Sequence, residues 1–183
     1  SVAKAMGTKT DGTLWGWGGT ALGSLGLNQG PVPSGGTYLS SPTQIPGTNW
    51  STSDKHLISQ YSTAFAIKTD GSLWAMGSGA HGILGLNQGT GTYISSPTQV
   101  PGTTWSDIGG TTQSAGRAIK TDGTLWVWGQ NAPGGQLTGA LGLNDIVSRS
   151  SPTQLPGTWA QVSTIPTACY GIKTDGTLWS WGM

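Results

Sequence analysis

The phrase Lys120-Thr121-Asp122-Gly123-Thr124-Leu125-Trp126 decides the class of fold, because it occurs four times in the chain. One copy differs, with Ser72 in place of the second threonine. Asp-Gly between two β-prone runs is a strong hairpin signal, since a type I′ turn needs positive φ at both central residues. Each copy therefore predicts a β-hairpin with a type I′ turn. The four copies begin at Lys9, Lys68, Lys120 and Lys173.

Two further phrases follow each of the first three copies, in the same order. Leu-Gly-Leu-Asn begins at Leu25, Leu84 and Leu141. Ser-Ser-Pro-Thr-Gln begins at Ser40, Ser95 and Ser150 and is followed by Trp50, Trp105 and Trp159. The phrases recur at intervals of about 50 to 60 residues, and internal repetition at a period of this length is typical of solenoids and propellers. We interpret residues 1–183 as one repeat domain of about three and a half units, which start near residues 1, 60, 112 and 165.

The rest of a unit predicts two more strands. The segment 151–156 holds Pro152 and Pro156, and proline lacks the N–H donor that an inner strand needs, so this is an outer or edge strand. Pro156-Gly157 predicts a turn, and the stretch from Trp159 to about Thr164 predicts another strand. Four short strands per unit are the content of one propeller blade. The sequence therefore predicts an all-β fold of β-propeller-like blades.

The composition supports this class and excludes others. The chain has 32 Gly, 10 Pro and 10 Trp, but only eight basic and seven acidic residues. Disorder is the competing interpretation of so much Gly, Ser and Pro, and the tryptophans and ordered repeats argue against it. Scattered basic residues give no electrostatic footprint for nucleic acid, and no apolar run is long enough for membrane insertion. The lone Cys169 excludes an intramolecular disulfide and a cysteine-based zinc site.

The ionisable residues form no recognisable catalytic or metal-binding pattern. Each hairpin phrase supplies one Asp carboxylate, which is far fewer oxygens than the six to eight that Ca²⁺ takes, and Asp is common in turns. Asp54, Asp107 and Asp145 fall at different positions of their units, so they indicate no carboxylate pair. Pairing of Cys169 with one of the two histidines stays open beside a buried structural cysteine. We expect no enzymatic activity, no cofactor and no metal.

Seven tryptophans lie in the Leu-Trp-x-Trp-Gly strands, and Met76 takes the place of the eighth. Residues two apart in a strand point to the same face. A repeated apolar face is most simply the packing between adjacent blades, and sugar stacking on exposed rings is the alternative. The seven are Trp15, Trp17, Trp74, Trp126, Trp128, Trp179 and Trp181.

Contacts with a partner are expected where the units differ, because loops carry recognition while repeated positions serve the scaffold. Three segments differ in length or composition between units: 29–39, 51–60 and 130–139. The candidate contact residues in them are Pro31, Pro33, Tyr38, Asp54, Lys55, His56, Asn131 and Gln136.

The order of these phrases resembles the repeat of the regulator-of-chromosome-condensation family, in which a Gly-x-Leu-Gly-x-Gly motif follows the Trp-Gly. Residues 23–28, Gly-Ser-Leu-Gly-Leu-Asn, match this motif except at the last position. The resemblance covers essentially the whole chain and implies a seven-bladed propeller. Three and a half units cannot close such a ring. We therefore expect either a segment of a larger propeller or copies that complete the ring together.

The family includes exchange factors, chromatin binders, lectin-like proteins and surface proteins, so the resemblance leaves the function open. We expect a structural or interaction module of a virion or cell surface, with proteins or other copies of the chain as partners. A glycan-binding, lectin-like propeller is the alternative. Exchange-factor, chromatin-binding and enzymatic roles are less favoured, because no basic patch, complete ring or catalytic set is evident.

Overall fold

The computed structural model describes residues 3–29, 38–89, 91–111, 114–132, 139–165 and 168–182. Within these ranges the chain is built of β-strands and three short 3₁₀ helices, so the all-β prediction is confirmed. No helix in this part of the chain has the length and hydropathy required to cross a bilayer.

The first half of the chain forms two antiparallel sheets, which we call blade 1 and blade 2. Blade 1 has the order β1 (Lys4–Thr8), β2 (Leu14–Gly19), β3 (Tyr38–Gln44). Blade 2 has the order β4 (Leu57–Gln60), β5 (Thr63–Ile67), β6 (Leu73–Ser78), β7 (Tyr93–Gln99). The proline-containing strands β3 and β7 lie at the ends of their sheets, as predicted for this part of the unit. The segment 151–156 itself belongs to a longer strand, Arg149–Thr164, which has a strand on each side.

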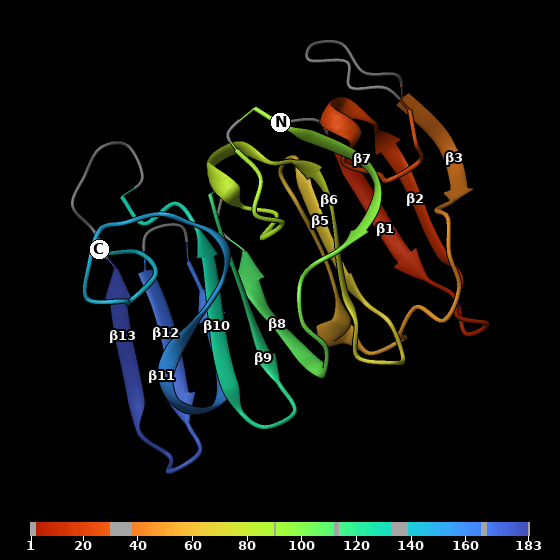
Figure 1. Ribbon diagram of the computed structural model, residues 1–183. Helices are drawn as coiled ribbons and strands as arrows, with labels where there is room; N and C mark the ends of the chain where they lie inside the picture. Colours follow the sequence, from red (N-terminus) through yellow and green to blue (C-terminus); the bar gives the residue numbers. More distant parts are fainter. Residues whose placement is uncertain are drawn as a thin grey trace.

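The second half forms one six-stranded sheet that comprises two blades (Figure 1). Blade 3 contains β8 (Trp105–Thr111), β9 (Ala115–Lys120), β10 (Thr124–Gly129) and the first part of β11 (Arg149–Thr164). Blade 4 contains the second part of β11, β12 (Ala168–Lys173) and β13 (Leu178–Gly182). Figure 1 shows the sheets side by side as a fan that runs from β3 at one edge to β13 at the other. This arrangement is that of an incomplete propeller.

The turn predicted at Pro156-Gly157 is wrong, because β11 continues through it as a 16-residue strand. Gly157 has a φ of 104°, close to the 106° of the equivalent Gly47. The first unit, however, has Asn49 at a φ of 61° before its tryptophan, and the third unit has no residue at that position. Without this left-handed residue the chain stays extended. It therefore pairs with β10 and then with β12, which joins blades 3 and 4.

The four hairpins are confirmed, but their turn type differs from the prediction. Only the glycine of each Asp-Gly has positive φ, for example Gly12 at 79°. The Gly12 N–H donates to the Lys9 carbonyl and the Lys9 N–H donates to the Thr13 carbonyl, both at 2.9 Å. A three-residue loop with a glycine bulge has this pattern. Asp11 stays at negative φ because its carboxylate accepts hydrogen bonds from Thr13, as in an Asx turn.

The core lies between the blades, as the repeated Leu-Trp-x-Trp face predicted. Fully buried Trp128 of β10 contacts Phe65 of blade 2 edge-to-face, with ring centroids 5.9 Å apart, and its indole N–H donates to the Ile83 carbonyl at 2.6 Å. A Cβ at Gly85 would lie 3.1 Å from this indole, and a Cβ at Gly142 would lie 2.9 Å from Trp181. The Leu-Gly-Leu-Asn glycine of one unit thus leaves room for the second aromatic residue of the next unit.

Candidate functional site

The repeated Lys-Thr-Asp-Gly phrase builds the scaffold of each hairpin. The Asp11 carboxylate accepts hydrogen bonds from the N–H of Thr13 at 2.9 Å and from its hydroxyl at 2.6 Å. The hydroxyl in turn accepts the indole N–H of Trp15 at 2.7 Å. These hydrogen bonds from Thr13 hold the pKa of Asp11 below its usual range. The same relay starts at Asp70, Asp122 and Asp175, so all four carboxylates serve their turns.

The lysine of each phrase lies over the first tryptophan of its own strand. Lys68 Nζ lies 4.3 Å from the ring centroid of Trp74 and 4.9 Å from that of buried Trp50. Lys120 has the same relation to Trp126 and Trp105, at 4.6 and 4.8 Å. Cation–π contact of this kind stabilises a partly exposed ring and covers one of its faces. These indoles therefore belong to the scaffold of the blades.

The charged segment 54–56 connects two blades. It forms the 3₁₀ helix η2 (Asp54–His56), with both His56 ring nitrogens in hydrogen-bonding contacts: Nδ1 with the Ser51 hydroxyl at 2.6 Å and Nε2 with the Ser106 carbonyl at 2.7 Å. Lys55 Nζ lies 3.6 Å from the Asp107 carboxylate of β8. Burial raises the pKa of Asp107, and Lys55 opposes this shift. The segment thus ties blade 2 to blade 3, while Asp54 and Lys55 remain exposed.

The other candidate contact residues have different surroundings. Asn131 is fully buried, and its amide group donates to the backbone carbonyl and carboxylate of Asp145 and accepts the Leu141 N–H. Its side chain therefore organises the loop rather than facing outward. Tyr38 is 72% exposed at the start of β3 and is free to meet a partner. Pro31, Pro33 and Gln136 lie outside the described residues.

Cys169 lies beside Arg117 at the junction of blades 3 and 4. The Arg117 Nη2 group donates to the Ala140 carbonyl at 2.8 Å, and the Cys169 thiol lies 3.7 Å from the same oxygen. Burial raises the pKa of the Cys169 thiol, and the Arg117 charge only partly opposes it. A buried thiol of raised pKa is a poor nucleophile. Both ring nitrogens of His56 contact Ser51 and Ser106, so His56 does not pair with Cys169.

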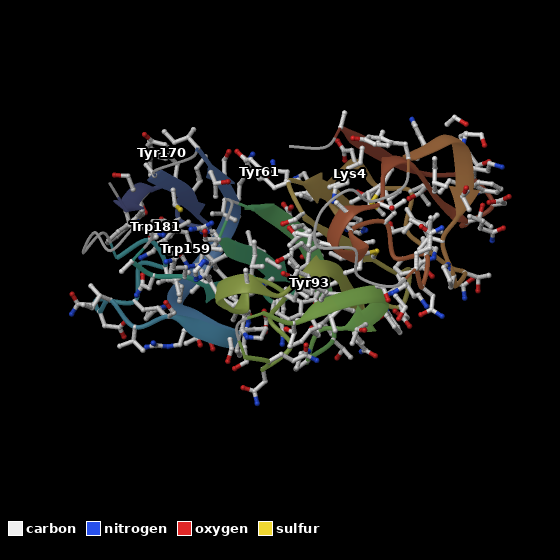
Figure 2. All side chains as sticks on the ribbon, turned by 90° about the horizontal axis from the view of Figure 1, so that it is seen from above. Lys4, Tyr61, Tyr93, Trp159, Tyr170 and Trp181 are labelled. Atoms are coloured by element: carbon white, nitrogen blue, oxygen red, sulfur yellow. The ribbon has the colours of Figure 1, made fainter. Side chains whose placement is uncertain are left out.

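Lys4 of β1 is a partly buried lysine at the junction of blades 1 and 2, where Figure 2 shows it. Its ammonium donates to the Thr63 carbonyl at 3.0 Å and to the Ser24 carbonyl at 3.4 Å. Burial lowers the pKa of Lys4 from 10.5 to about 7. The junction therefore contains a group that changes its charge near neutral pH.

The outer faces of blades 1 and 4 are apolar and exposed. Leu14, Leu73 and Leu125 are 0% exposed, whereas Leu178, at the same position of the last hairpin, is 70% exposed. Strands β2, β6 and β10 each pair with a following strand, and within the described residues β13 has no such partner. Tyr170, Ile172 and Trp179 are also exposed, and Figure 2 places Tyr170 at the outer edge of the molecule.

Blade 1 shows the complementary feature at the other end of the fan. Trp17 is 36% exposed, while the equivalent residues Met76 and Trp128 are fully buried against the preceding unit. The two terminal blades therefore present the two different sides of one repeated blade–blade interface.

An open pocket of about 330 Å³ lies at the junction of blades 2 and 3. It is lined by glycines and by the side chains of His81, Asn87, Gln88, Gln130, Ser148 and Ser150. Of these six, the sequence singled out Gln130, within the segment 130–139, and His81, as one of the two histidines considered for pairing with Cys169. Both could also have been noticed by comparing the units. His81 stands where the first unit has Leu22, and Gln130 stands where the second unit has Ser78.

Comparison with known proteins supports the fold and leaves the family open. No protein-family model and no curated protein matches the sequence. Human WBSCR16 superposes with a TM-score of 0.74 at 18% identity, over 98% of this chain and 45% of its own. Yeast RCC1 (Prp20) bound to Kap60 gives 0.74 at 17% identity, over 100% and 43%. Prp20p from Saccharomyces cerevisiae, studied for its binding to Gsp1p and histones, gives 0.72 at 16% identity, over 98% and 43%.

These similarities show that the chain has the fold of β-propeller blades. The chain spans less than half the length of these similar structures. The expected incomplete propeller is thereby confirmed.

Proposed function

We propose that this chain is a non-enzymatic protein-interaction module whose terminal blade faces bind further blades of the same kind, including those of a second copy. The observation that carries the proposal is the 70% exposure of Leu178, at a position that is fully buried in the other three hairpins. Contiguous exposed apolar side chains mark interaction surfaces in soluble proteins.

The junction of blades 2 and 3 is the template for this contact. There Phe65 of β5 packs against Trp128 of the next blade. Tyr170 of blade 4 is equivalent to Phe65. Tyr170 pairs with Ser180 and Phe65 pairs with Ala75, and both partners stand at the third position of the Leu-Trp-x-Trp phrase. Trp17 of blade 1 occupies the Trp128 position. One copy therefore offers the first half of the interface and another copy offers the second half, which is a head-to-tail association.

Protein binding is also a property recorded for similar folds. The yeast protein Prp20 has been crystallised with Kap60, and its binding to Gsp1p and histones has been studied. For this chain we place the module on a virion or cell surface, since low charge and near-identical repeats are typical of repeat arrays in such structures. Localisation of the tagged protein in its source, with immunogold labelling of intact particles or cells, tests this placement.

The association is tested by measuring mass by light scattering over a range of concentrations. We expect the mass to rise with concentration for the unmodified chain and to stay monomeric for Leu178→Asp. Ile146→Asp is the matched control, because Ile146 is 48% exposed but lies in the loop before β11. A monomeric unmodified chain at every concentration would refute the proposal.

A mixing experiment tests the head-to-tail geometry. Trp17→Asp blocks one face and Leu178→Asp blocks the other, so each variant alone stays monomeric. An equal mixture restores one intact junction and should give a heterodimer. If the mixture stays monomeric while the unmodified chain associates, the contact uses other surfaces.

A further inference from the structure

Strand β13 has a free edge where each of the other blades carries one more strand (Figure 1). In blades 1, 2 and 3 this outer strand contains the Ser-Ser-Pro-Thr-Gln phrase, and within the described residues β13 has no strand in that place. The Leu14 carbonyl accepts the Ile45 N–H at 2.8 Å, and in the next blade the Leu73 carbonyl accepts the Val100 N–H at the same distance. The Leu178 carbonyl is the equivalent acceptor for a further strand.

The side chains along this edge lack the cover that the phrase provides in the other blades. In blade 2 the leucine of the hairpin phrase, Leu73, and the aliphatic residue after Thr-Gln, Val100, are fully buried in one core cluster. Gln99 pairs there with the first tryptophan of the strand. In blade 4 the counterparts of that leucine and tryptophan, Leu178 and Trp179, are exposed. A strand with a glutamine followed by an aliphatic residue would therefore cover both.

A loop of blade 3 forms a second wall beside this edge. Residues 139–144 repeat the backbone of the Leu-Gly-Leu-Asn loops of the first two units, and Asn144 has a φ of 57°, against 54° at both Asn28 and Asn87. The loop lies beside β13, since its second glycine is in close contact with Trp181 of that strand. We call the region between β13 (Leu178–Gly182) and residues 139–144 the strand site.

In the first two units the equivalent loop holds the outer strand of the next blade. The Asn28 N–H donates to the Ser95 carbonyl at 2.6 Å, and a Cβ at Gly23 would lie 2.8 Å from the Ser95 Cα. The second unit makes both contacts with Ser150. The glycine thus permits close approach of the strand, and the asparagine N–H binds the first serine of the phrase.

The loop 139–144 has the same groups, and among the described residues no strand lies against it. A Cβ at Gly139 would meet only the Asp145 carbonyl oxygen there, at 3.7 Å. Gly139 is partly exposed, whereas Gly23 and Gly82 are buried. In the described part of the chain no carbonyl accepts the Asn144 N–H. Both walls of the strand site therefore present contacts that are already made in the other blades.

We propose that the strand site binds an extended segment of a partner polypeptide of the type Ser-Ser-Pro-Thr-Gln-aliphatic-Pro, antiparallel to β13. The first serine lies against Gly139, and its carbonyl accepts the Asn144 N–H. The aliphatic residue donates its N–H to the Leu178 carbonyl and covers the Leu178 side chain. In strand addition the main-chain hydrogen bonds give affinity, and the side chains give specificity. This inference rests on the proposed function and deepens it, because it names a partner for the edge of blade 4 besides the blade that contacts its face.

The test measures binding of a synthetic peptide with the sequence of residues 93–102 to the chain that carries Trp17→Asp. The blade–blade contact is blocked in this variant, so peptide binding is measured separately from self-association. Titration followed in amide spectra should give saturable shifts at Leu178–Gly182 and at residues 139–144, and a peptide of scrambled sequence should give none.

Three results would overturn the proposal while leaving the blade–blade association open to its own test by light scattering. The first is no saturable binding of the peptide, and the second is equal binding of the scrambled peptide. The third is a set of shifts at Leu178–Gly182 that depends on protein concentration without peptide, because it would indicate edge-to-edge pairing of two copies. Peptide binding to a chain that does not self-associate would support the strand site and contradict the blade–blade contact.

Substitutions test the two walls separately. Gly139→Ala should weaken peptide binding roughly tenfold or more, because the added Cβ takes the space of the serine backbone. Gly176→Ala is the matched control, since Gly139 and Gly176 both have positive φ, 58° and 85°, and a Cβ at Gly176 meets nothing within 4 Å. Equal affinities of these two variants would overturn the assignment to the loop.

The wall at β13 is tested on the peptide itself. Methylation of the backbone nitrogen of Val100 in the peptide removes the N–H that donates to the Leu178 carbonyl, so affinity should fall roughly tenfold or more. An unchanged affinity of the methylated peptide would overturn the pairing with β13. Unchanged amide spectra away from the strand site verify that each protein variant is folded.

Discussion

Replacement of Lys4 by methionine is expected to stabilise the chain and to flatten its stability against pH. The Lys4 ammonium is partly buried between blades 1 and 2, where it donates to the carbonyls of Thr63 and Ser24. Burial lowers the pKa of Lys4 from 10.5 to about 7 in the folded chain. Between these pH values the unfolded chain binds more protons than the folded chain, so the free energy of unfolding rises with pH across this window.

The magnitude follows from the same interval. The difference between 10.5 and about 7, at about 1.4 kcal/mol per pH unit, sets a ceiling of about 5 kcal/mol for the penalty below pH 7. The two carbonyl hydrogen bonds offset part of it. We therefore expect Lys4→Met to recover on the order of 2 kcal/mol at pH 6 and little at pH 10.

Urea unfolding at pH 6, 8 and 10 measures this effect by fluorescence of the ten tryptophans. The difference in the free energy of unfolding between variant and unmodified chain isolates Lys4 from other groups that titrate in the same window. Lys55→Met is the control, because the Lys55 side chain is 57% exposed and its removal should not change the slope between pH 7 and 10. Parallel pH profiles for Lys4→Met and the unmodified chain would refute the reasoning.

Three further outcomes are expected. Trp128→Ala should cost about 3–5 kcal/mol in urea unfolding, because it empties a fully buried site between blades, whereas half-exposed Trp17 should cost clearly less; equal costs would contradict the packing. Asp122→Ala should lower the melting temperature at pH 7 and make it less sensitive to acid. Hydrogen bonds from Thr124 depress the pKa of Asp122, and the stability that they provide is lost as the pH falls through that pKa. Calorimetry at pH 7 and pH 3 measures both effects. Insertion of Asn after Thr158 restores the spacing of the first unit and should interrupt β11. Hydrogen exchange should then be faster around residue 157. Unchanged protection there would contradict our explanation of the continuous strand.

The repeated phrases predicted most of the local structure correctly. Asp-Gly predicted each hairpin, the prolines of the Ser-Ser-Pro-Thr-Gln phrase predicted edge strands, and the Leu-Trp-x-Trp spacing predicted the packing between blades. These features depend on local geometry and on which face of a strand is apolar, and both can be read from spacing. The turn type was wrong because the Asp carboxylate binds the backbone of Thr13 and keeps Asp11 at negative φ.

The candidate contact residues were harder to predict, because their environment is set by distant parts of the chain. His56 contacts the Ser106 carbonyl fifty residues away, so the segment 54–56 connects two blades, which its sequence does not indicate. Asn131 is a candidate contact residue by sequence, and hydrogen bonds with Asp145 and Leu141 hold its buried side chain. The pocket at the junction of blades 2 and 3 was not evident from the sequence, although Gln130 of its wall lies in the segment 130–139, because the wall comes from two blades.

The sequence by itself determined that the chain is a tandem array of β-hairpin blades, because every repeat carries the same turn, glycine and tryptophan positions. Only the tertiary structure decided which of these equivalent positions are buried and which are free. Leu125 and Leu178 stand in the same phrase, yet the first is fully buried and the second is 70% exposed. The physical reason is that burial depends on the neighbouring strand and blade, and a residue in a repeat does not encode whether those neighbours are present.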